Sequence, residues 1–184
     1  TSYEVTVKYQ NGEYHLVGQN ADEYPTPAVL KEDAVSLTLS AQIVSDGLVR
    51  TIFATADDEL RPVMNGIFFD INEEGATFVA SDGHKLVCNR NSNVKADGKS
   101  SFILPKKPAS LFRSLINKEA EEITIEFDSR IARFSLPEFR MLCRLIDGRY
   151  PNYGSVIPQN NPHRLVMDRQ TLVTALRRVS VFSP

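Results

Sequence analysis

The chain has 184 residues, 42% of them hydrophobic, which is enough for one large domain or two small ones with a buried core. Its 21 basic and 23 acidic side chains give a formal net charge of −2, which argues against nucleic-acid binding unless the charges are segregated on the surface. No apolar stretch is long enough to cross a bilayer and no signal-peptide pattern opens the sequence, so we expect a cytoplasmic protein.

The first residues predict a β-hairpin. Apolar residues alternate along one face of an expected strand, at Tyr3, Val5, Val7 and Tyr9. The pair Asn11-Gly12 follows and predicts a tight turn, because glycine tolerates the positive φ that such turns need. A second alternating run begins at Tyr14, and the proline-containing residues 22–27 then interrupt regular structure.

A succession of strand, helix and three strands comes next. A short strand at 35–39 leads into a helix of about residues 40–56, with Ser40 as the expected N-cap. The apolar face of this helix contains Val44, Leu48 and Ile52. The three strands are expected at 64–71, 76–81 and 85–89, with turns at 73–75 and 82–83.

The same succession recurs. A short strand at 101–104 is followed by a helix of about residues 105–118, opened by Pro105, with Leu111, Phe112, Leu115 and Ile116 expected to face inward. Three more strands are expected at 122–127, 131–136 and 139–145. The predicted fold class is therefore α+β, with two βαβββ repeats and helices on one face of antiparallel sheets.

Two further similarities extend the repeat. Residues 147–151 resemble residues 21–25, so the first 27 residues look like the end of an earlier copy. Residues 163–167 resemble the strand that precedes the first helix, and a helix is expected from about Asp168. The sequence thus reads as part of a longer array of such units.

The charges are distributed unevenly between helices and the rest of the chain. Basic residues outnumber acidic ones by eight to two in the three expected helices, whereas acidic residues crowd into turns such as 57–59 and 73–74. If the helices line one surface, that surface is basic and suits a polyanion held through its phosphates. The alternative is that these residues only solvate exposed helix faces.

Two groups of residues have side chains that are able to carry chemistry. Cys88 and Cys143 lack the spacing of a zinc site or a disulfide framework, so we expect two buried thiols. The segment 81–85 places Asp82 two residues before His84, which could form an acid–base pair or hold a metal. An Asp-Gly pair between two strands is, however, first a hairpin turn, and no other nucleophile, phosphate-binding or metalloprotease motif is present.

Three segments together resemble the bacterial DNA sliding clamp, the β subunit of DNA polymerase III. They are Arg61-Pro62-Val63-Met64-Asn65-Gly66-Ile67, Ala80-Ser81-Asp82-Gly83-His84-Lys85-Leu86 and Leu145-Ile146-Asp147-Gly148-Arg149-Tyr150-Pro151-Asn152-Tyr153. Their order and spacing are similar to those of the family over essentially the whole chain. The resemblance implies the DNA clamp fold.

The resemblance also implies a domain organisation and a function. Residues 1–27 would be the end of the first clamp domain, 28–153 the complete central domain, and 154–184 the linker and the first strand and helix of the third. The family is a non-catalytic processivity factor without a cofactor, a homodimeric ring that encircles duplex DNA without reading its sequence. Its partners are the polymerase III alpha subunit, the clamp loader, other DNA polymerases and repair proteins, which bind through short linear motifs in the bacterial cytoplasm.

The family's peptide-binding pocket has matching positions in this sequence. They are Arg61, Met64, Ser81, Gly83, His84, Lys85, Leu86, Pro151, Ser155 and Val156. Apolar members would form a slot and His84 and Lys85 its rim, with adaptable Met64 suited to varied partners. The sequence departs from the family at three positions: Lys85 replaces a common arginine, Ser155 replaces a common basic residue, and Pro62 is unusual beside the pocket.

Two further sets of residues follow from the resemblance. The DNA-facing side chains would be Arg50, Lys106, Lys107, Arg113, Arg177 and Arg178. Val181 and Phe182 match positions of the dimer contact, whose partner surface is on the first domain. We therefore expect residues 1–184 alone not to close a ring.

Two other functions are compatible with the sequence. One is a metal-dependent hydrolase or nuclease centred on Asp82 and His84, and the other is a protein-interaction module built from duplicated α+β halves. No metal ligand set and no catalytic residue is predicted for the clamp. Peptide affinity and metal-dependent activity of a His84→Ala variant distinguish the clamp from the nuclease.

Overall fold

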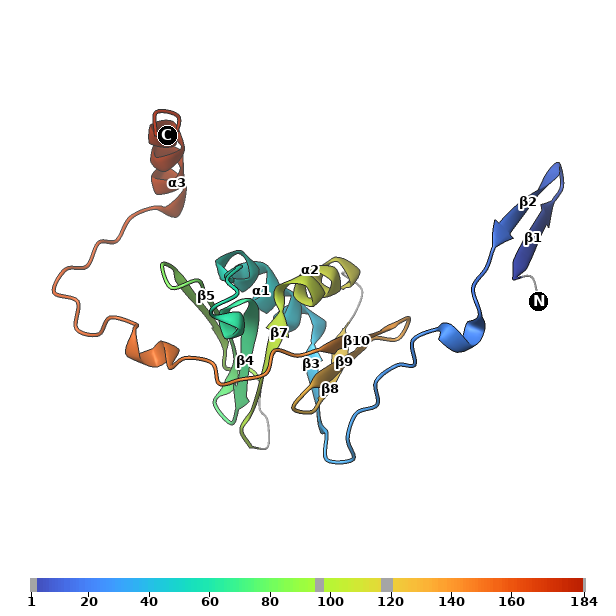
Figure 1. Ribbon diagram of the computed structural model, residues 1–184. Helices are drawn as coiled ribbons and strands as arrows, with labels where there is room; N and C mark the ends of the chain where they lie inside the picture. The colour runs from blue at the N-terminus through green and yellow to red at the C-terminus, as the bar shows by residue number, and fades with distance from the viewer. Residues whose placement is uncertain (1–2, 95–97, 117–120, 184) are drawn as a thin grey trace. The chain divides into compact units, whose positions relative to one another are not determined.

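A computed structural model describes residues 3–94, 98–116 and 121–183 of the protein (Figure 1). The chain divides into two compact units, residues 1–150 and 151–184. No helix in the described part of the chain is long and apolar enough to cross a membrane.

The first unit contains the two predicted βαβββ repeats. The first repeat consists of β3 (Val35–Ser40), α1 (Ala41–Thr51), β4 (Gly66–Asn72), β5 (Gly75–Ser81) and β6 (Leu86–Asn91). The second consists of β7 (Ser100–Pro105), α2 (Lys106–Leu115), β8 (Glu122–Phe127), β9 (Ile131–Ser135) and β10 (Arg140–Arg144). The predicted order of elements is confirmed, with bounds shifted by a few residues. Residues 117–118, the predicted end of the second helix, lie outside the described residues.

The two repeats exchange their first strands. One antiparallel sheet has the order β10-β9-β8-β3 and the other the order β6-β5-β4-β7. In the first, Val35 pairs with Phe127 and Ser40 with Glu122, and in the second Ile71 pairs with Ser100 and Gly66 with Pro105. Each sheet therefore takes three strands from one repeat and one from the other, so neither repeat can complete its sheet alone.

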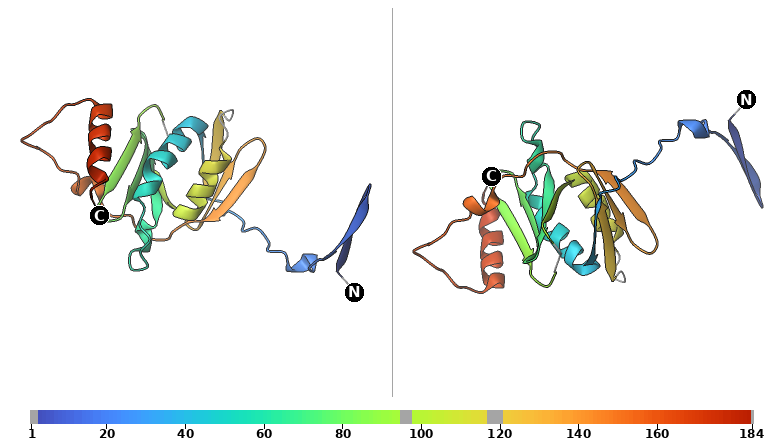
Figure 2. Two further views of the ribbon diagram at one scale, coloured as in Figure 1. Left: turned by 90° about the horizontal axis from the view of Figure 1, so that it is seen from above. Right: turned by 90° about the horizontal axis from the view of Figure 1, so that it is seen from below.

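Both helices pack on the same side of the two sheets. From above, α1 and α2 lie next to each other with one sheet to either side (Figure 2). Helix α1 contacts strands of both sheets, and α2 contacts β4 and β7. The predicted placement of the helices on one face is thus confirmed.

Helix α1 forms for the reasons that its sequence indicates. Val44, Leu48 and Ile52 are all buried, as their helical spacing predicts. Ser40 occupies the N-cap position, but its side chain makes no capping hydrogen bond. A glycine on the buried face, Gly47, lets the helix backbone approach the ring of Phe78 on β5, where a Cβ would lie 2.5 Å from the ring. Close helix–sheet packing here depends on the absence of a side chain.

Helix α2 buries a narrower stripe than predicted. Ala109 and Phe112 are fully buried and Ile116 is partly buried. Leu111 and Leu115, expected to face inward, are 54% and 39% exposed. Residues one position apart on a helix point about 100° away from each other, so the sheets cover the stripe of Phe112 and leave that of Leu111 in solvent. The inward assignment of these two leucines was wrong.

The segment after β10 ties the two sheets together. The backbone N–H of Leu145 donates to the carbonyl of Arg130 (2.7 Å), and that of Ile146 donates to Ile103 on the other sheet (3.1 Å). Tyr150, at the end of the first unit, is buried and stacks on Phe68 with ring centroids 4.8 Å apart. Its burial raises the pKa of Tyr150 to about 12. This stack anchors the point at which the chain leaves the first unit.

The N-terminal hairpin is formed by β1 (Glu4–Tyr9) and β2 (Gly12–Val17), paired antiparallel. Its turn consists of Gln10 and Asn11, because Gly12 already pairs with Tyr9, so the predicted turn is one residue out of place. The rings of Tyr9 and Tyr14 stack at 5.4 Å on the expected apolar face. That face is exposed in this chain.

The second unit contains a short 3-10 helix, Tyr153–Ser155, and α3 (Arg169–Ser180). Asp168 is the N-cap of α3, where its carboxylate accepts the N–H of Thr171 (2.8 Å), as the sequence predicts. Residues 163–167 form no strand, contrary to expectation. A β-strand needs a neighbouring strand to take its hydrogen bonds, and the described part of this unit offers none.

Both cysteines are free thiols in this structure. They lie on strands β6 and β10 and are partly rather than fully buried. Burial raises the pKa of Cys143 to about 11 and also raises that of Cys88. Both thiols are therefore protonated and weakly nucleophilic at neutral pH.

Candidate partner-binding and DNA-facing surfaces

The turn between β5 and β6 is organised by the carboxylate of Asp82. Its Oδ1 accepts the backbone N–H groups of His84 and Lys85, both at 2.9 Å. Its Oδ2 pairs with the ammonium group of Lys85. The N–H of Gly83 donates to the hydroxyl of Ser81 (3.1 Å), and Gly83 has a φ of 91°, in the region that favours glycine. These contacts hold His84 and Lys85 at the exposed tip of the turn.

This geometry leaves little for the hydrolase or nuclease interpretation of the segment. The Lys85 ammonium and two backbone N–H groups hold the pKa of Asp82 well below its usual range, so the carboxylate stays ionised and saturated with donors. In the described ranges, no cluster of three or more histidine, cysteine or acidic residues could hold a metal ion. Asp82 therefore acts as a structural turn residue.

A second loop meets this turn through Arg61. The guanidinium Nε donates to Oδ2 of Asp58 (2.8 Å), and an Nη donates to the carbonyl of Asp82 (3.4 Å). The same group lies against Gly83, where a Cβ would be 2.6 Å from a guanidinium nitrogen. The loop is closed by Asn65, whose side-chain amide exchanges two 2.9 Å hydrogen bonds with the backbone of Asp58. Arg61 therefore links the loop at 58–65 to the turn at 81–85.

Most of the predicted pocket residues in the first unit are brought together by these contacts. Arg61, Ser81, Gly83 and Lys85 interact directly with Asp82 or with one another. Leu86 begins β6 opposite Ser81, and Met64 ends the short 3-10 helix Pro62–Met64; both are partly buried.

The remaining predicted pocket residues, Pro151, Ser155 and Val156, belong to the second unit. The N–H of Ser155 and its hydroxyl both donate to the carbonyl of Asn152, which closes the 3-10 helix. Val156 is exposed. Their place relative to the first unit stays a prediction.

The residue patterns did not predict that Asp58 pairs with Arg61 or that Asp82 pairs with Lys85. A local signal was present, since each acid lies three positions before the cation that it pairs with. Acid and base at that spacing meet in a turn as they do in a helix. Reading 58–61 and 82–85 in this way would have predicted both ion pairs.

Gly83→Ala is expected to destabilise the turn by about 1 kcal/mol, because alanine is disfavoured at positive φ and its Cβ would displace Arg61. Thermal unfolding of the first unit should show a reduced midpoint. Gly98→Ala is the control in the same unit, since Gly98 also has a positive φ (107°) but a Cβ there meets nothing within 4 Å, so a difference between the variants reports the contact with Arg61. Equal midpoints for the two variants would contradict the prediction.

The predicted DNA-facing residues of the first unit lie on α1, on α2 or at their ends. Arg50 in the last turn of α1 is within 3.7 Å of Asp46, and Lys106 at the start of α2 pairs with Asp57. Lys107 and Arg113 are exposed and form no ion pair with any described carboxylate. Within the described part of the α1–α2 face, Lys107 and Arg113 are therefore the cations without an ion pair, and Asp57 offsets the unfavourable position of Lys106 at a helix N-terminus.

The second unit contains the remaining predicted DNA-facing residues and the predicted dimer contact. Arg177 and Arg178 occupy the last turn of α3, where basic side chains are favoured by the helix dipole. Val181 and Phe182, the predicted dimer contact, follow the helix and are 76% and 89% exposed. Two adjacent apolar side chains in solvent are available for a partner.

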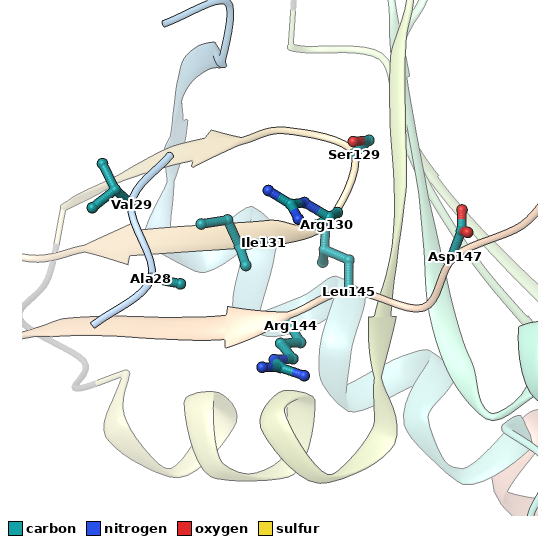
Figure 3. Close-up of a pocket in the computed structure, with 8 residues that line it drawn as sticks. All are labelled: Ala28, Val29, Ser129, Arg130, Ile131, Arg144, Leu145 and Asp147. Atoms are coloured by element: carbon teal, nitrogen blue, oxygen red, sulfur yellow. The ribbon is translucent and has the colours of Figure 1, made fainter. Parts of the chain in front are cut away.

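A separate cavity of about 660 Å³ lies beside the start of β9 and the end of β10 (Figure 3). Arg130 and Ile131 line it from the start of β9, Arg144 and Leu145 from the end of β10, and the segment of Ala28 and Val29 lies beside them. The N–H of Lys31 donates to Asp128 (3.2 Å) and holds this segment against the sheet. None of the predicted sites includes this cavity.

Curated proteins with similar sequences are named beta sliding clamps. A beta sliding clamp of Synechococcus elongatus is 32% identical over 184 aligned positions, covering 97% of this chain and 48% of that protein. One of Staphylococcus aureus is 26% identical, covering 98% and 48%. The chain thus spans about half the length of the curated relatives that it matches.

Solved structures of clamps superpose closely. The sliding clamp of Bartonella birtlesii bound to griselimycin has a TM-score of 0.87 at 27% identity, covering 98% of this chain and 50% of that one. The DNA polymerase III subunit beta of Pseudomonas aeruginosa has a TM-score of 0.87 at 23% identity, covering 97% and 49%, and supports the fold.

The family model that matches is that of the DNA polymerase III beta subunit, central domain, over residues 38–152. This segment contains both helices of the first unit and the turn at 81–85. Since the match covers more than half of the chain and nearly all of both βαβββ repeats, the protein belongs to the family of DNA polymerase III beta subunits, the bacterial sliding clamps.

Proposed function

We propose that this chain is part of a sliding clamp, a non-catalytic processivity factor that encircles duplex DNA as a homodimeric ring during replication in the bacterial cytoplasm. The observation that carries this proposal is the family match over both βαβββ repeats together with the basic α1–α2 face. The ring tethers the alpha subunit of DNA polymerase III, the clamp loader, other polymerases and repair proteins.

In this proposal, residues 1–27 end the first clamp domain, 28–153 form the central domain and 154–184 begin the third. The division of the chain into compact units at 150 and 151 supports a boundary close to residue 153. The central assignment is supported by two complete repeats between Val35 and Arg144. Val181 and Phe182 then serve in the dimer contact of the complete protein.

The DNA surface consists of Arg50, Lys106, Lys107, Arg113, Arg177 and Arg178. Mobile lysine and arginine side chains attract phosphates without reading bases, which suits movement along the duplex. Arg50 and Lys106 are already paired with acids, so their attraction is weakened. We therefore expect Lys107 and Arg113 to contribute most within the central domain.

The full-length protein should remain on nicked circular DNA and leave the same DNA once it is linearised. Equal retention on both forms would contradict topological binding. Changing Lys107 and Arg113 together to glutamate should reduce retention on the circle at least about threefold at physiological salt, because two phosphate contacts become repulsive. The measurement is gel filtration of labelled protein with the DNA at several salt concentrations.

The control for this variant reverses two charges far from the helices. Lys99 lies before β7, at the end opposite α2, and Arg130 lies beyond β8, at the end opposite α1. The double change Lys99→Glu and Arg130→Glu alters the net charge equally but should leave retention unchanged. A matching loss in both variants would show that only net charge matters.

The partner surface consists of Arg61, Met64, Ser81, Gly83, His84, Lys85 and Leu86 with Pro151, Ser155 and Val156. The ordered turn and loop of the first unit support it, because a preformed surface binds a short peptide at a lower entropic cost. A relative bound to griselimycin supports a ligand-binding surface on this family. The His84→Ala variant should bind partner peptides more weakly than the wild type. It should neither gain nor lose a metal-dependent hydrolytic activity.

A further inference from the structure

Two ion pairs stand next to each other on the surface formed by the loop at 58–65 and the turn at 81–85. One joins Arg61 to Asp58 at 2.8 Å, and the other joins Lys85 to Asp82. In each pair the acid is the less exposed member, with 28% and 20% of the Asp58 and Asp82 side chains accessible against 48% and 47% for the cations. The carboxylates thus lie beneath the basic groups.

Both acids are held in place by the backbone as well as by the cations. Oδ1 of Asp58 accepts the N–H of Leu60 (2.9 Å), while Oδ1 of Asp82 accepts two N–H groups of its own turn. The Arg61 guanidinium lowers the pKa of Asp58, and the Lys85 ammonium lowers that of Asp82. At neutral pH two fixed negative charges therefore neutralise the two cations of this surface.

An incoming acidic residue gains less from Arg61 and Lys85 than it would from two cations without carboxylates beneath them. It can approach Arg61 or Lys85 only by sharing the cation with a carboxylate a few ångströms away, and like charges at that separation repel. A neutral or apolar residue meets no such penalty. Built-in repulsion of this kind is a common source of binding specificity.

We propose that Asp58 and Asp82 determine the specificity of this surface, so that it accepts short apolar peptide segments with uncharged flanks and disfavours acidic ones. The inference rests on the peptide-binding surface of the proposed function. Asp82 has a second, positioning role, since the same carboxylate orients His84 and Lys85.

The test uses the full-length protein and two synthetic octapeptides with a central Leu-Leu-Phe segment, one flanked by glutamines and one by glutamates. The variant Asp58→Asn with Asp82→Asn removes both negative charges, but its amide oxygens still accept the backbone N–H groups. The wild type should bind the glutamine peptide at least as tightly as the glutamate peptide. In the variant the glutamate peptide should gain about fivefold over the glutamine peptide, and added salt should remove the gain.

Asp128→Asn is the matched control. Asp128 also accepts two backbone N–H groups in a turn, those of Arg130 and Ile131, but this turn connects β8 and β9 of the other sheet. This variant should leave the peptide ratio unchanged. A change as large as that of the double variant would overturn the proposal.

The outcomes separate the two levels of inference. If both peptides bind and the double variant keeps the wild-type ratio, the specificity role of the two acids is wrong while the peptide surface stands. If neither peptide binds to wild-type protein that is still retained on circular DNA, the peptide surface itself is wrong, and the specificity role with it.

Discussion

Replacing Phe69 by alanine is expected to lower the free energy of unfolding of the first unit by about 3–5 kcal/mol, the range for a buried phenylalanine. The ring is fully buried. It stacks on Phe102 with centroids 4.5 Å apart and meets Phe78 edge-on at 4.8 Å. Phe69 lies on β4, opposite Phe102 on β7 and Phe78 on β5. Removing its ring therefore leaves a cavity where β7, the strand from the second repeat, pairs with the sheet of the first. Denaturant unfolding of residues 1–184 followed by circular dichroism measures the effect.

Phe53→Ala is the control for this prediction. Phe53 is 63% exposed beyond the end of α1. Removing a ring that is mostly in solvent should change the free energy of unfolding by less than about 1 kcal/mol. A loss as large as that of Phe69→Ala would mean that the core does not extend through β4 as described.

Gly47→Ala is expected to destabilise the first unit by about 1–3 kcal/mol, the usual cost of overpacking a close contact. On an exposed helix the same change would stabilise by about 1 kcal/mol, because alanine is the better helix former. Here the added Cβ would lie 2.5 Å from Cγ and one Cδ of Phe78 and 2.7 Å from the other Cδ. That ring is itself fixed against Phe69, so the helix must move away from the sheet.

Ser45→Ala gives the matched comparison on the same helix. Ser45 is only partly buried, and alanine there should be neutral or slightly stabilising. The two variants introduce the same residue two positions apart, so a difference between them reports the contact with Phe78. If Gly47→Ala is as stable as Ser45→Ala, the helix is not held at the distance seen here.

The elements of the fold follow closely from local patterns. Alternation over 122–127 and 131–136 matches β8 and β9 within a residue, since each strand exposes one face and buries the other. The stripe of Val44, Leu48 and Ile52 likewise identifies the buried face of α1. Such patterns are imposed by a nearby core and are therefore visible in a short window of sequence.

The exchange of β3 and β7 between the repeats has no such local signal. Strand β3 pairs with β8, and the two lie more than eighty residues apart along the chain. A strand's pattern shows which face is buried but not which neighbour takes its hydrogen bonds. The exposure of Leu111 and Leu115 was missed for a related reason, because the width of a buried stripe depends on how much of α2 the sheets cover.

The candidate sites divide in the same way. Residue types and spacing determine the turn at 82–83, the cap at Asp168 and the excess of basic residues on helices, because each depends on groups a few positions apart. Only the folded chain brings Arg61 onto Gly83 and Asp57 onto Lys106, since those contacts join segments more than twenty residues apart. Which cations remain free to meet a phosphate or a peptide is therefore decided by tertiary structure, because an ion pair depends on the distance between charges in space and not along the sequence.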